Sequence, residues 1–595
     1  MRRLLEEVSF RHPDRARADV ERVGEGVAPR TLAVVENLLA SVPDPDEALH
    51  CLERFRQANP AAFDRISASP AALRHLITTF AYSRFLAEAV SKNPEWLLAT
   101  TESGLLHRTR SAEEYEADLV AHLGGDATSV PSAAALARFR RQQLLRILLR
   151  DVLGLASLAD VTGELSNLAD AILDVAYRRI REALARRHGD AAGCGFAVLA
   201  LGKLGGKELN YSSDIDLMFV YSANGQTAGR EPVSYKEFFK KLANSYTELL
   251  STYTADGLCY RVDLRLRPDG KNGEVCISLE GARSYYATRA RDWELQMLIK
   301  ARISAGDRAP GQELLDSVEP RIYSSTLDFR ALEAVSETRE RINEKLARRR
   351  GAQAGLDIKL APGGIRDIEF LVQCLQRLHG GRERWLRHGG TQLALERLRD
   401  KLLLSGPEHS RLLTAYQFLR NLEHRLQFYD DRQTHTLPED LEELDVLARK
   451  MPLGLAGGLP SADSLKRELD AHLAHVRELY DRVIHANNPL YYGAPVEGHP
   501  ESHPEGAPGG IPEGAAPAGG NALPGTAPPA DRPAVAASNL TRYLDQRAPR
   551  LAAQLARAPL GRGAARAGRL EHFLEKMLAA PELLARLDFE PPLVD

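Results

Sequence analysis

The stretch that decides the fold reads Gly202-Lys-Leu-Gly-Gly-Lys-Glu-Leu-Asn-Tyr-Ser-Ser-Asp214-Ile-Asp216. It lies between two apolar runs, Phe196–Leu201 and Leu217–Tyr221, which are typical of buried strands. Side chains two residues apart on a strand point to the same side, so we expect Asp214 and Asp216 to share one pocket. Two adjacent carboxylates need a counter-charge, and Mg²⁺ is the usual one. The glycine-rich loop before them predicts a phosphate site.

A third carboxylate, Asp263, comes from the next clear strand pattern. Residues 258–267 alternate completely, with apolar side chains on one face and Asp263, Arg265 and Arg267 on the other. Taken alone, an Asp-x-Asp is more often a solvated turn, and an Arg/Asp strand face is more often a salt-bridge ladder. An Asp-x-Asp with a third aspartate on a neighbouring strand is what two-metal nucleotidyl transfer needs. Together with the glycine loop, the three aspartates favour a metal-dependent nucleotidyltransferase.

Glycines and basic residues around these aspartates are candidates for contacting phosphate groups. Glycine lets backbone N–H groups approach a nucleotide, and the planar fork of arginine suits phosphate oxygens. The loop matches neither the P-loop pattern nor GxGxxG, which argues against a Rossmann site. Lys207 adds positive charge to the loop. The residues predicted to bind nucleotide or phosphate are Gly202, Lys203, Gly205, Gly206, Ser213, Arg265, Arg267, Lys300 and Arg302.

The bulk composition excludes several classes of protein. A chain of 595 residues exceeds what one hydrophobic core normally holds, so we expect several domains. A net charge of −3, from 78 basic and 81 acidic residues, gives no global attraction to nucleic acid or to an anionic membrane. Five scattered cysteines predict neither a zinc site nor a disulfide framework. No apolar run suits a membrane span or a signal peptide, so we expect a reduced, cytoplasmic protein.

The pattern along the chain predicts an α+β protein in which a small mixed sheet is flanked by large helical regions. Apolar spacings of three and four predict helices on both sides of the glycine loop, among them Tyr285–Ile303, Ala331–Arg350 and Ile365–Leu378. A segment rich in Pro, Gly and Ala predicts a disordered linker. The predicted domains are a helical N-terminal region at 1–190, a nucleotidyltransferase domain at 191–310, a helical bundle at 311–491, the linker at 492–537 and a helical segment at 538–595, which would begin a second module.

Several segments resemble, in the same order, those of the glutamine synthetase adenylyltransferase/adenylyl-removing enzymes, a family of polymerase-β-like nucleotidyltransferases. The resemblance covers roughly residues 75–490 and is specific, because several unrelated motifs agree. Lys203 stands where the wider superfamily has a small residue, as is typical of this branch. The matching segments are Gly202–Leu217, Tyr260–Pro268, Arg291–Glu294, Lys300–Arg302, Gly363–Phe370, Leu419–Gln427 and Gln433–Pro438.

The resemblance implies a fold, a reaction and partners. It implies that Asp214, Asp216 and Asp263 hold Mg²⁺ and catalyse nucleotidyl transfer on a tyrosine of glutamine synthetase, under control of the PII signalling protein. Family members carry two catalytic halves: one removes AMP with inorganic phosphate, yielding ADP, and the other adds AMP from ATP. The segments Ser-Ser-Asp-Ile-Asp and Arg-Asp-Trp-Glu resemble those of the N-terminal half, which removes AMP. The chain carries one such module, so we expect either a fragment or a divergent short form.

Two other functions stay open on the sequence. The same module could transfer AMP from ATP to glutamine synthetase, or the chain could bind glutamine synthetase or PII without turnover. Arg366, Asp367 and Glu369 follow a Gly-Gly pair at an expected helix start, where free N–H groups favour anions. A packing contact between domains explains these three residues equally well.

Overall fold

The computed structural model describes residues 8, 10–124, 129–323, 355–452 and 460–484. The chain divides after Val496 into two units, and all described residues belong to the first. Three predicted segments lie outside the described residues: the helix Ala331–Arg350, the linker at 492–537 and the helical segment at 538–595. None of the described helices combines the length and the apolar character that crossing a bilayer requires.

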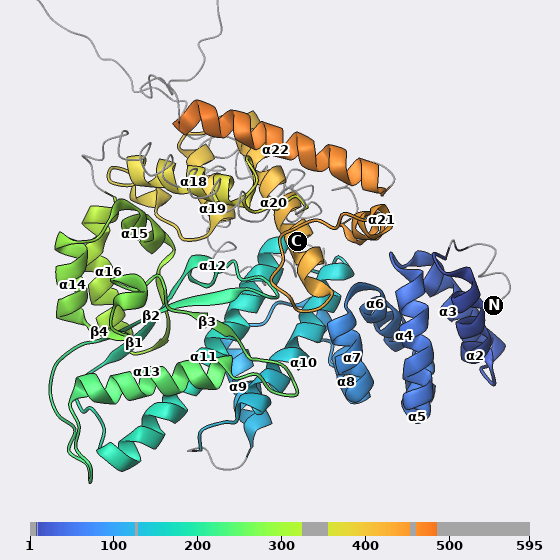
Figure 1. Cartoon of the computed structure of the whole chain (residues 1–595), viewed down its shortest axis with the longest axis horizontal. Helices are drawn as coiled ribbons and strands as arrows, with labels where there is room; N and C mark the ends of the chain where they lie inside the picture. Colours follow the sequence, from blue (N-terminus) through green and yellow to red (C-terminus); the bar gives the residue numbers. More distant parts are fainter. Residues whose placement is uncertain (1–7, 9, 125–128, 324–354, 453–459, 485–595) are drawn as a thin grey trace, which may run out of the picture. The chain divides into compact units, whose positions relative to one another are not determined.

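The described residues between 13 and 188 form helices joined by connecting segments (Figure 1). Proline opens many of them, at a position where its missing N–H removes no helical hydrogen bond. The longest begins with a capping box of Ser157 and Asp160 and ends before Gly189, whose φ is +78°. The helices are α2 (Pro13–Gly24), α3 (Pro29–Ser41), α4 (Pro45–Ala58), α5 (Pro60–Ser67), α6 (Pro70–Tyr82), α7 (Arg84–Lys92), α8 (Pro94–Glu102), η1 (Leu105–His107), α9 (Ala112–Leu123), α10 (Ala133–Val152) and α11 (Leu158–His188).

A five-stranded mixed sheet follows these helices. Its order is β3-β2-β1-β5, and β4 pairs with β2 as well. β1 runs antiparallel to β2 and to β5, whereas β2 runs parallel to β3 and to β4. The predicted α+β class and both strands that flank the glycine loop are confirmed. The strands are β1 (Phe196–Leu201), β2 (Asp214–Tyr221), β3 (Arg261–Asp263), β4 (Cys276–Ser278) and β5 (Arg302–Gly306).

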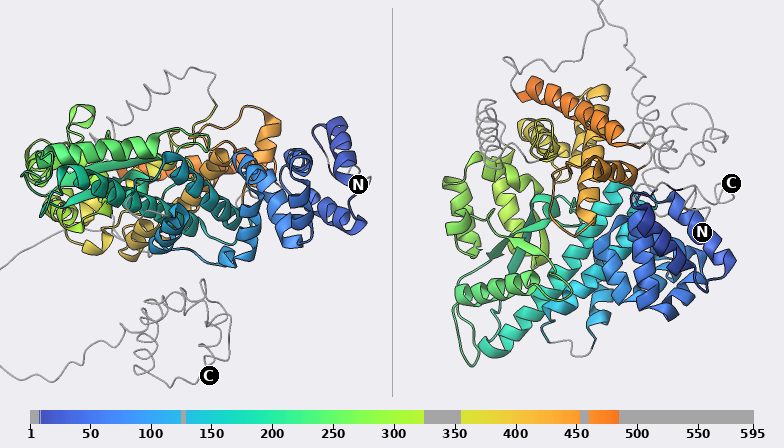
Figure 2. Two further views of the ribbon diagram at one scale, coloured as in Figure 1. Left: turned by 90° about the horizontal axis from the view of Figure 1, so that it is seen from below. Right: turned by 45° about the vertical axis from the view of Figure 1, so that its right-hand side comes forward.

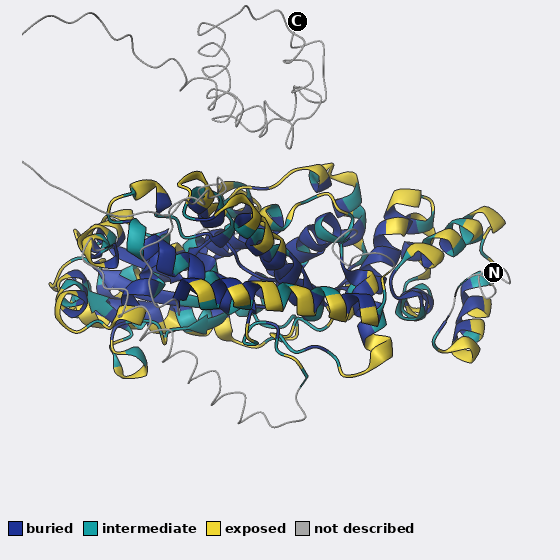
Figure 3. Ribbon diagram, turned by 90° about the horizontal axis from the view of Figure 1, so that it is seen from above, coloured by how far each residue is buried: buried dark blue, intermediate teal, exposed yellow. Residues whose placement is uncertain are grey.

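Both faces of the sheet are covered by helices, which explains why β1 is apolar throughout. Phe196, Val198 and Ala200 belong to a core shared with α11 and α13, while Ala197 and Leu199 pack with α14 and α16 (Figure 1). Inward-facing residues are dark blue in Figure 3, and exposed residues line the outer sides of the helices. The elements around the strands are α12 (Gly202–Gly205), α13 (Tyr235–Ser251), η2 (Gly270–Asn272), α14 (Leu279–Thr288), α15 (Asp292–Met297), η3 (Leu298–Lys300) and α16 (Arg308–Ile322).

The strand predicted at 258–267 is shorter than its alternation suggests, because β3 covers Arg261–Asp263 alone. The Asp263 carboxylate accepts a hydrogen bond from the backbone N–H of Arg265 at 2.8 Å, which turns the chain away from the sheet. Arg265 and Arg267 therefore do not share a strand face with Asp263, and that prediction was wrong.

The helix predicted at Tyr285–Ile303 was also wrong. The segment contains the end of α14, the short helix α15 and the start of β5. Ile303 pairs with Leu199 of β1 across the sheet. β1 needs a hydrogen-bonding partner along its second edge, and this tertiary demand overrides a spacing that suits a helix.

A second helical region follows the sheet and packs around its own core. Helix α20 also lies beside α10 and α11 in two views (Figures 1 and 2). At its end, the Ser83 hydroxyl donates to the Phe428 carbonyl at 2.6 Å. The predicted helix Ile365–Leu378 is confirmed as α18, one residue longer. The elements are α18 (Ile365–His379), η4 (Arg384–Leu386), α19 (Thr391–Asp400), α20 (Gly406–Phe428), α21 (Leu441–Lys450) and α22 (Ala462–Ile484).

Candidate active site

The pairing of β2 with β3 brings the three predicted aspartates to one edge of the sheet. Because the strands run parallel in register, Asp216 lies directly beside Asp263, and Asp214 lies beside Arg261. Ile215, between the two β2 aspartates, is fully buried on the opposite side. The Asp-x-Asp spacing therefore places both carboxylates on the side away from the core, as the strand period predicts.

The charge balance at this edge favours a cation. Burial, together with the neighbouring carboxylates of Asp263 and Asp214, raises the pKa of Asp216 to about 7. Lys359 and Arg265 act in the opposite direction but do not outweigh these effects. A half-buried carboxylate beside two others is the environment in which a hard divalent ion replaces a proton. The oxygen donors present thus fit Mg²⁺.

Two arginines hold the outer aspartates. Nε of Arg261 lies 2.9 Å from Oδ1 of Asp214, and Nε of Arg265 lies 2.7 Å from Oδ2 of Asp263. Burial acts to raise the pKa of Asp263, but the hydrogen bonds from Arg265 outweigh it and lower the pKa. Among the described residues, three potential metal ligands lie within 4.8 Å of one another at a different place, formed by Asp19, His50 and Glu53. A cation at the three aspartates would compete with both guanidinium groups.

The predicted glycine-rich loop is one helical turn, α12, and its glycines have different neighbours. Gly202 has a φ of +54°, and a Cβ on it would collide with the Asp216 carboxylate. A Cβ on Gly205 would collide with the backbone carbonyl of Lys300, and one on Gly206 would lie 2.8 Å from the carbonyl of Gly389. Gly202 is thus the glycine that adjoins the aspartates, whereas the other two permit backbone packing.

Lys300 and Arg302, predicted to contact phosphate, are bound by protein groups. Nζ of Lys300 lies 2.9 Å from both Glu208 and Glu369 and is almost fully buried. Burial lowers the pKa of Lys300, yet the two carboxylates outweigh it and raise the pKa. The guanidinium of Arg302 donates to Asp170 at 2.8 Å and to the carbonyl of Leu204. The contact of Glu369 with Lys300 agrees with the interpretation of Glu369 as a packing contact between domains.

Lys203 and Arg267 are likewise engaged. Nζ of Lys203 lies 2.6 Å from the fully buried Glu423 of α20, and burial lowers the pKa of Lys203 to about 8. Arg267 donates to backbone carbonyls, including Leu264 at 2.6 Å and Gly273 at 2.9 Å. Ser213 is buried immediately before β2. Of the predicted basic residues, Arg265 alone combines a contact to a candidate catalytic aspartate with a mostly exposed side chain, 65 %.

Besides Arg261, two residues near the aspartates were not predicted as site residues. Lys359 lowers the pKa of Asp216, so its charge acts on that carboxylate. Gln433 faces Asp214, and with the amide nitrogen turned toward it, that nitrogen lies 3.2 and 3.3 Å from the two carboxylate oxygens. Both come from the helical region beyond the sheet. The family-like motif Gln433–Pro438 was a sequence signal for the second, but nothing local linked either residue to Asp214.

The comparisons with known proteins match the residues that form this site. Residues 73–317 match the family model "Glutamate-ammonia ligase adenylyltransferase", and residues 336–484 match "GlnD PII-uridylyltransferase". A bifunctional glutamine synthetase adenylyltransferase/adenylyl-removing enzyme of Thioalkalivibrio sulfidiphilus is 37% identical over 420 residues, 69% of this chain and 42% of that protein. The enzyme of the same name from Xanthomonas campestris pv. campestris (strain B100) is 39% identical over 362 residues, 60% of this chain and 38% of that protein.

The chain thus spans less than half the length of these relatives. The matched regions include β1, β2, β3 and all three aspartates, together with the helices α18 to α22 that contribute Glu423. Over the matched residues, the chain is similar to the bifunctional glutamine synthetase adenylyltransferase/adenylyl-removing enzymes.

Proposed function

We propose that this site catalyses Mg²⁺-dependent nucleotidyl transfer on a tyrosine of glutamine synthetase, in the direction that removes AMP. The observation that carries the proposal is the convergence of Asp214, Asp216 and Asp263 beside the backbone of Gly202. The names of the related enzymes include both adenylyl transfer and adenylyl removal, and they support glutamine synthetase as the substrate. Removal is favoured by the resemblance of the Ser-Ser-Asp-Ile-Asp and Arg-Asp-Trp-Glu segments to the N-terminal half of the family.

Each group at the site has a role in this proposal. Asp214, Asp216 and Asp263 would hold Mg²⁺, which supplies positive charge at the reacting phosphate when bound. Gly202 leaves room for the Asp216 carboxylate beside the turn. Arg265 is exposed enough to reach an incoming phosphate, and the charge of Lys359 acts at the same carboxylate. We assign positioning roles to the residues whose charged groups are already bound by protein: Lys203, Arg267, Lys300 and Arg302.

The reaction requires little general acid or base catalysis from the side chains of the protein. An oxygen of inorganic phosphate attacks the phosphorus of the AMP group, and the bond from that phosphorus to the tyrosine oxygen breaks. The products are ADP and the tyrosine phenolate, which takes a proton from water. A phenol has a pKa near 10, so its anion leaves readily and requires no strong general acid. Arg265 would neutralise and orient the attacking phosphate.

Glutamine synthetase is the macromolecular substrate in this proposal, and PII is the proposed regulator. The match of residues 336–484 to a PII-uridylyltransferase model supports a link to PII. A second candidate function is the transfer of AMP from ATP to glutamine synthetase, because the related enzyme is also named an adenylyltransferase. The same three aspartates would serve both directions.

The test combines two substrate pairs with one double variant. AMP-modified glutamine synthetase with phosphate and Mg²⁺ should yield ADP, whereas unmodified glutamine synthetase with ATP should gain little AMP. Asp214→Asn with Asp216→Asn should abolish ADP formation, and the exposed Asp316→Asn on α16 should not. Retained ADP formation in the double variant would refute the assignment of the aspartates. Turnover with ATP alone would establish the second candidate, and no turnover with either pair would favour a binding module.

A further inference from the structure

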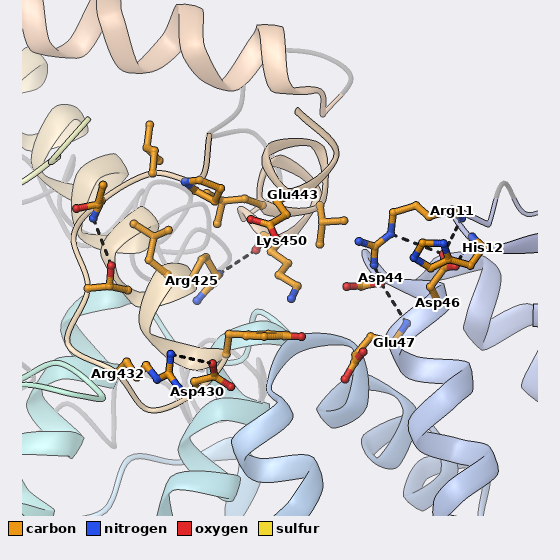
Figure 4. Close-up of a pocket in the computed structure, with 18 of the residues that line it drawn as sticks. Arg11, His12, Asp44, Asp46, Glu47, Arg425, Asp430, Arg432, Glu443 and Lys450 are labelled. Atoms are coloured by element: carbon orange, nitrogen blue, oxygen red, sulfur yellow. Dashed lines mark hydrogen bonds and ion pairs between the residues drawn. The ribbon is translucent and has the colours of Figure 1, made fainter. Parts of the chain in front are cut away.

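A pocket of about 540 Å³ lies away from the three aspartates, between the N-terminal helices and the end of α20 (Figure 4). One wall comes from α2 and α4 and the loops before them, with Arg11 and Asp44. The other comes from α20, α21 and the segment between them, with Tyr429 and Lys450. Nε of Arg449 donates to the Pro43 carbonyl at 2.8 Å and joins the two walls. The volume is in the range of small-molecule sites.

Lys450 is the unusual residue of this pocket. Its side chain points into the space between the walls, and the residue is 6 % exposed (Figure 4). Among the described residues it has no ion-pair or hydrogen-bond acceptor for Nζ; its contact is the ring of Tyr429, whose centroid lies 5.4 Å from Nζ. Burial lowers the pKa of Lys450, and the more distant Asp44 and Glu47 do not restore it. A buried ammonium group without an acceptor favours an anionic ligand.

Two acidic residues of the facing wall, Asp44 and Asp46, are already neutralised in part, and Glu47 also lines the pocket. Asp44 accepts from the Arg11 guanidinium at 2.6 Å. The two oxygens of Asp46 accept from the backbone N–H groups of Arg11 and His12, each at 3.0 Å. These carboxylates therefore do not compete fully for Lys450. Apolar side chains complete the lining and suit the carbon skeleton of a metabolite: Leu426, Leu437, Val446 and Leu447.

The segment 432–436 forms part of the pocket and also reaches the candidate active site. Arg432, Thr434 and Thr436 line the pocket. The residues that alternate with them contact groups on the catalytic side, because Gln433 faces Asp214 and Nδ1 of His435 lies 3.0 Å from Glu423. One short piece of backbone thus separates the two sites.

We propose that this pocket is an effector site for a small organic or inorganic anion, a carboxylate or a phosphate, whose charged group pairs with Lys450. The bound anion orders the segment 432–436 and thereby holds Gln433 against Asp214. Anion binding stands independently of the proposed function; its effect on catalysis rests on that function.

Hydrogen exchange of the full chain tests the proposal without an activity assay. The probes are succinate for a carboxylate and inorganic phosphate for a phosphate, each compared with chloride at equal ionic strength. With an anion at about ten times its Kd, exchange of the amides in 432–437 should slow by roughly tenfold if opening of the segment excludes the anion. The double variant Asp214→Asn with Asp216→Asn should show the same protection, which separates this pocket from phosphate bound at the aspartates.

Three lysine variants decide the outcome. Lys450→Met should lose the protection, Lys450→Arg should keep it, and Lys466→Met, at an exposed position of α22, should behave as wild type. Protection by succinate alone or by phosphate alone supports the proposal and identifies the ligand class. Equal protection in Lys450→Met overturns it. So does the absence of protection by both anions at millimolar concentration in the wild type and in Lys450→Arg, the variant that retains the charge.

Discussion

The ammonium group of Lys203 lies 2.6 Å from the carboxylate of Glu423, which follows it by 220 residues. Lys203 comes directly after the glycine that touches Asp216, and Glu423 is fully buried in α20. Glu423 is also 3.1 Å from Arg420 and 3.0 Å from His435. The helical region is therefore joined to the turn that shapes the candidate active site by buried charges.

Lys203→Met should destabilise the protein by about 3 kcal/mol, the lower end for a broken buried pair, because Arg420 and His435 still face Glu423. Urea unfolding measures the change. Lys236→Met is the matched control, because the pair of Lys236 with Glu274 is exposed and should contribute less than about 1 kcal/mol. Equal effects of the two variants would show that the buried pair does not link the two regions.

Asp216→Asn should make the metal-free protein more stable at pH 8. The pKa of Asp216 is about 7 in the folded protein and near 4 in an unfolded chain, so the folded state binds its proton more tightly. The stability this provides is fully present below pH 4 and is lost as the pH rises through 7. Thermal unfolding in EDTA should show a higher Tm for the variant at pH 8 and no advantage at pH 4. A lower Tm at pH 8 would contradict the repulsion between the carboxylates.

Divalent-ion affinity should depend on pH for the same reason. Asp216 must lose its proton before it can coordinate a cation, so Mn²⁺ should bind roughly tenfold more weakly at pH 6 than at pH 8. Titration followed by electron paramagnetic resonance measures free Mn²⁺ directly. In Asp216→Asn the remaining weak binding should lose most of this dependence. A pH-independent affinity in the wild type would mean that Asp216 is not a ligand.

Gly202→Ala should abolish the proposed transfer, with at least about a hundredfold loss of kcat/KM, because the new methyl group occupies the position of the Asp216 carboxylate. The positive φ of Gly202 adds strain for alanine. Gly163→Ala in α11 is the control, since a Cβ there meets nothing within 4 Å and removes backbone freedom from the unfolded chain. The control should be as active as the wild type and slightly more stable. Full activity of Gly202→Ala would exclude a close approach at this turn.

The sequence was sufficient for the parts of the fold that local patterns determine. β1 coincides with its apolar run and β2 ends where its run does, and the two-residue period places Asp214 and Asp216 on one side. The third aspartate was assigned to a neighbouring strand, and it lies directly beside Asp216. These features follow from burial and from the strand period, which a single segment carries by itself.

The basic residues show why the remaining features of the site could not be predicted from the sequence. Arg265, Lys300 and Arg302 look alike in sequence, but Lys300 contacts Glu208 and Glu369 while Arg265 remains exposed. Such contacts join residues tens to hundreds of positions apart, and no local spacing encodes them. The alternation at 258–267 misled for a related reason, because the Asp263 side chain accepts a hydrogen bond from the backbone N–H of Arg265 and the strand ends early.

The buried ion pairs between the sheet and α18 to α20 have a practical consequence for recombinant dissection of the chain. A fragment covering 191–310 would keep Lys203, Lys300 and Glu208 but would remove Glu423 and Glu369 from them. Lys203 would then lose its counter-ion, and the surface that α20 covers would face solvent. We expect that piece to aggregate, whereas an excised unit extending through Ile484 keeps every one of these pairs within itself.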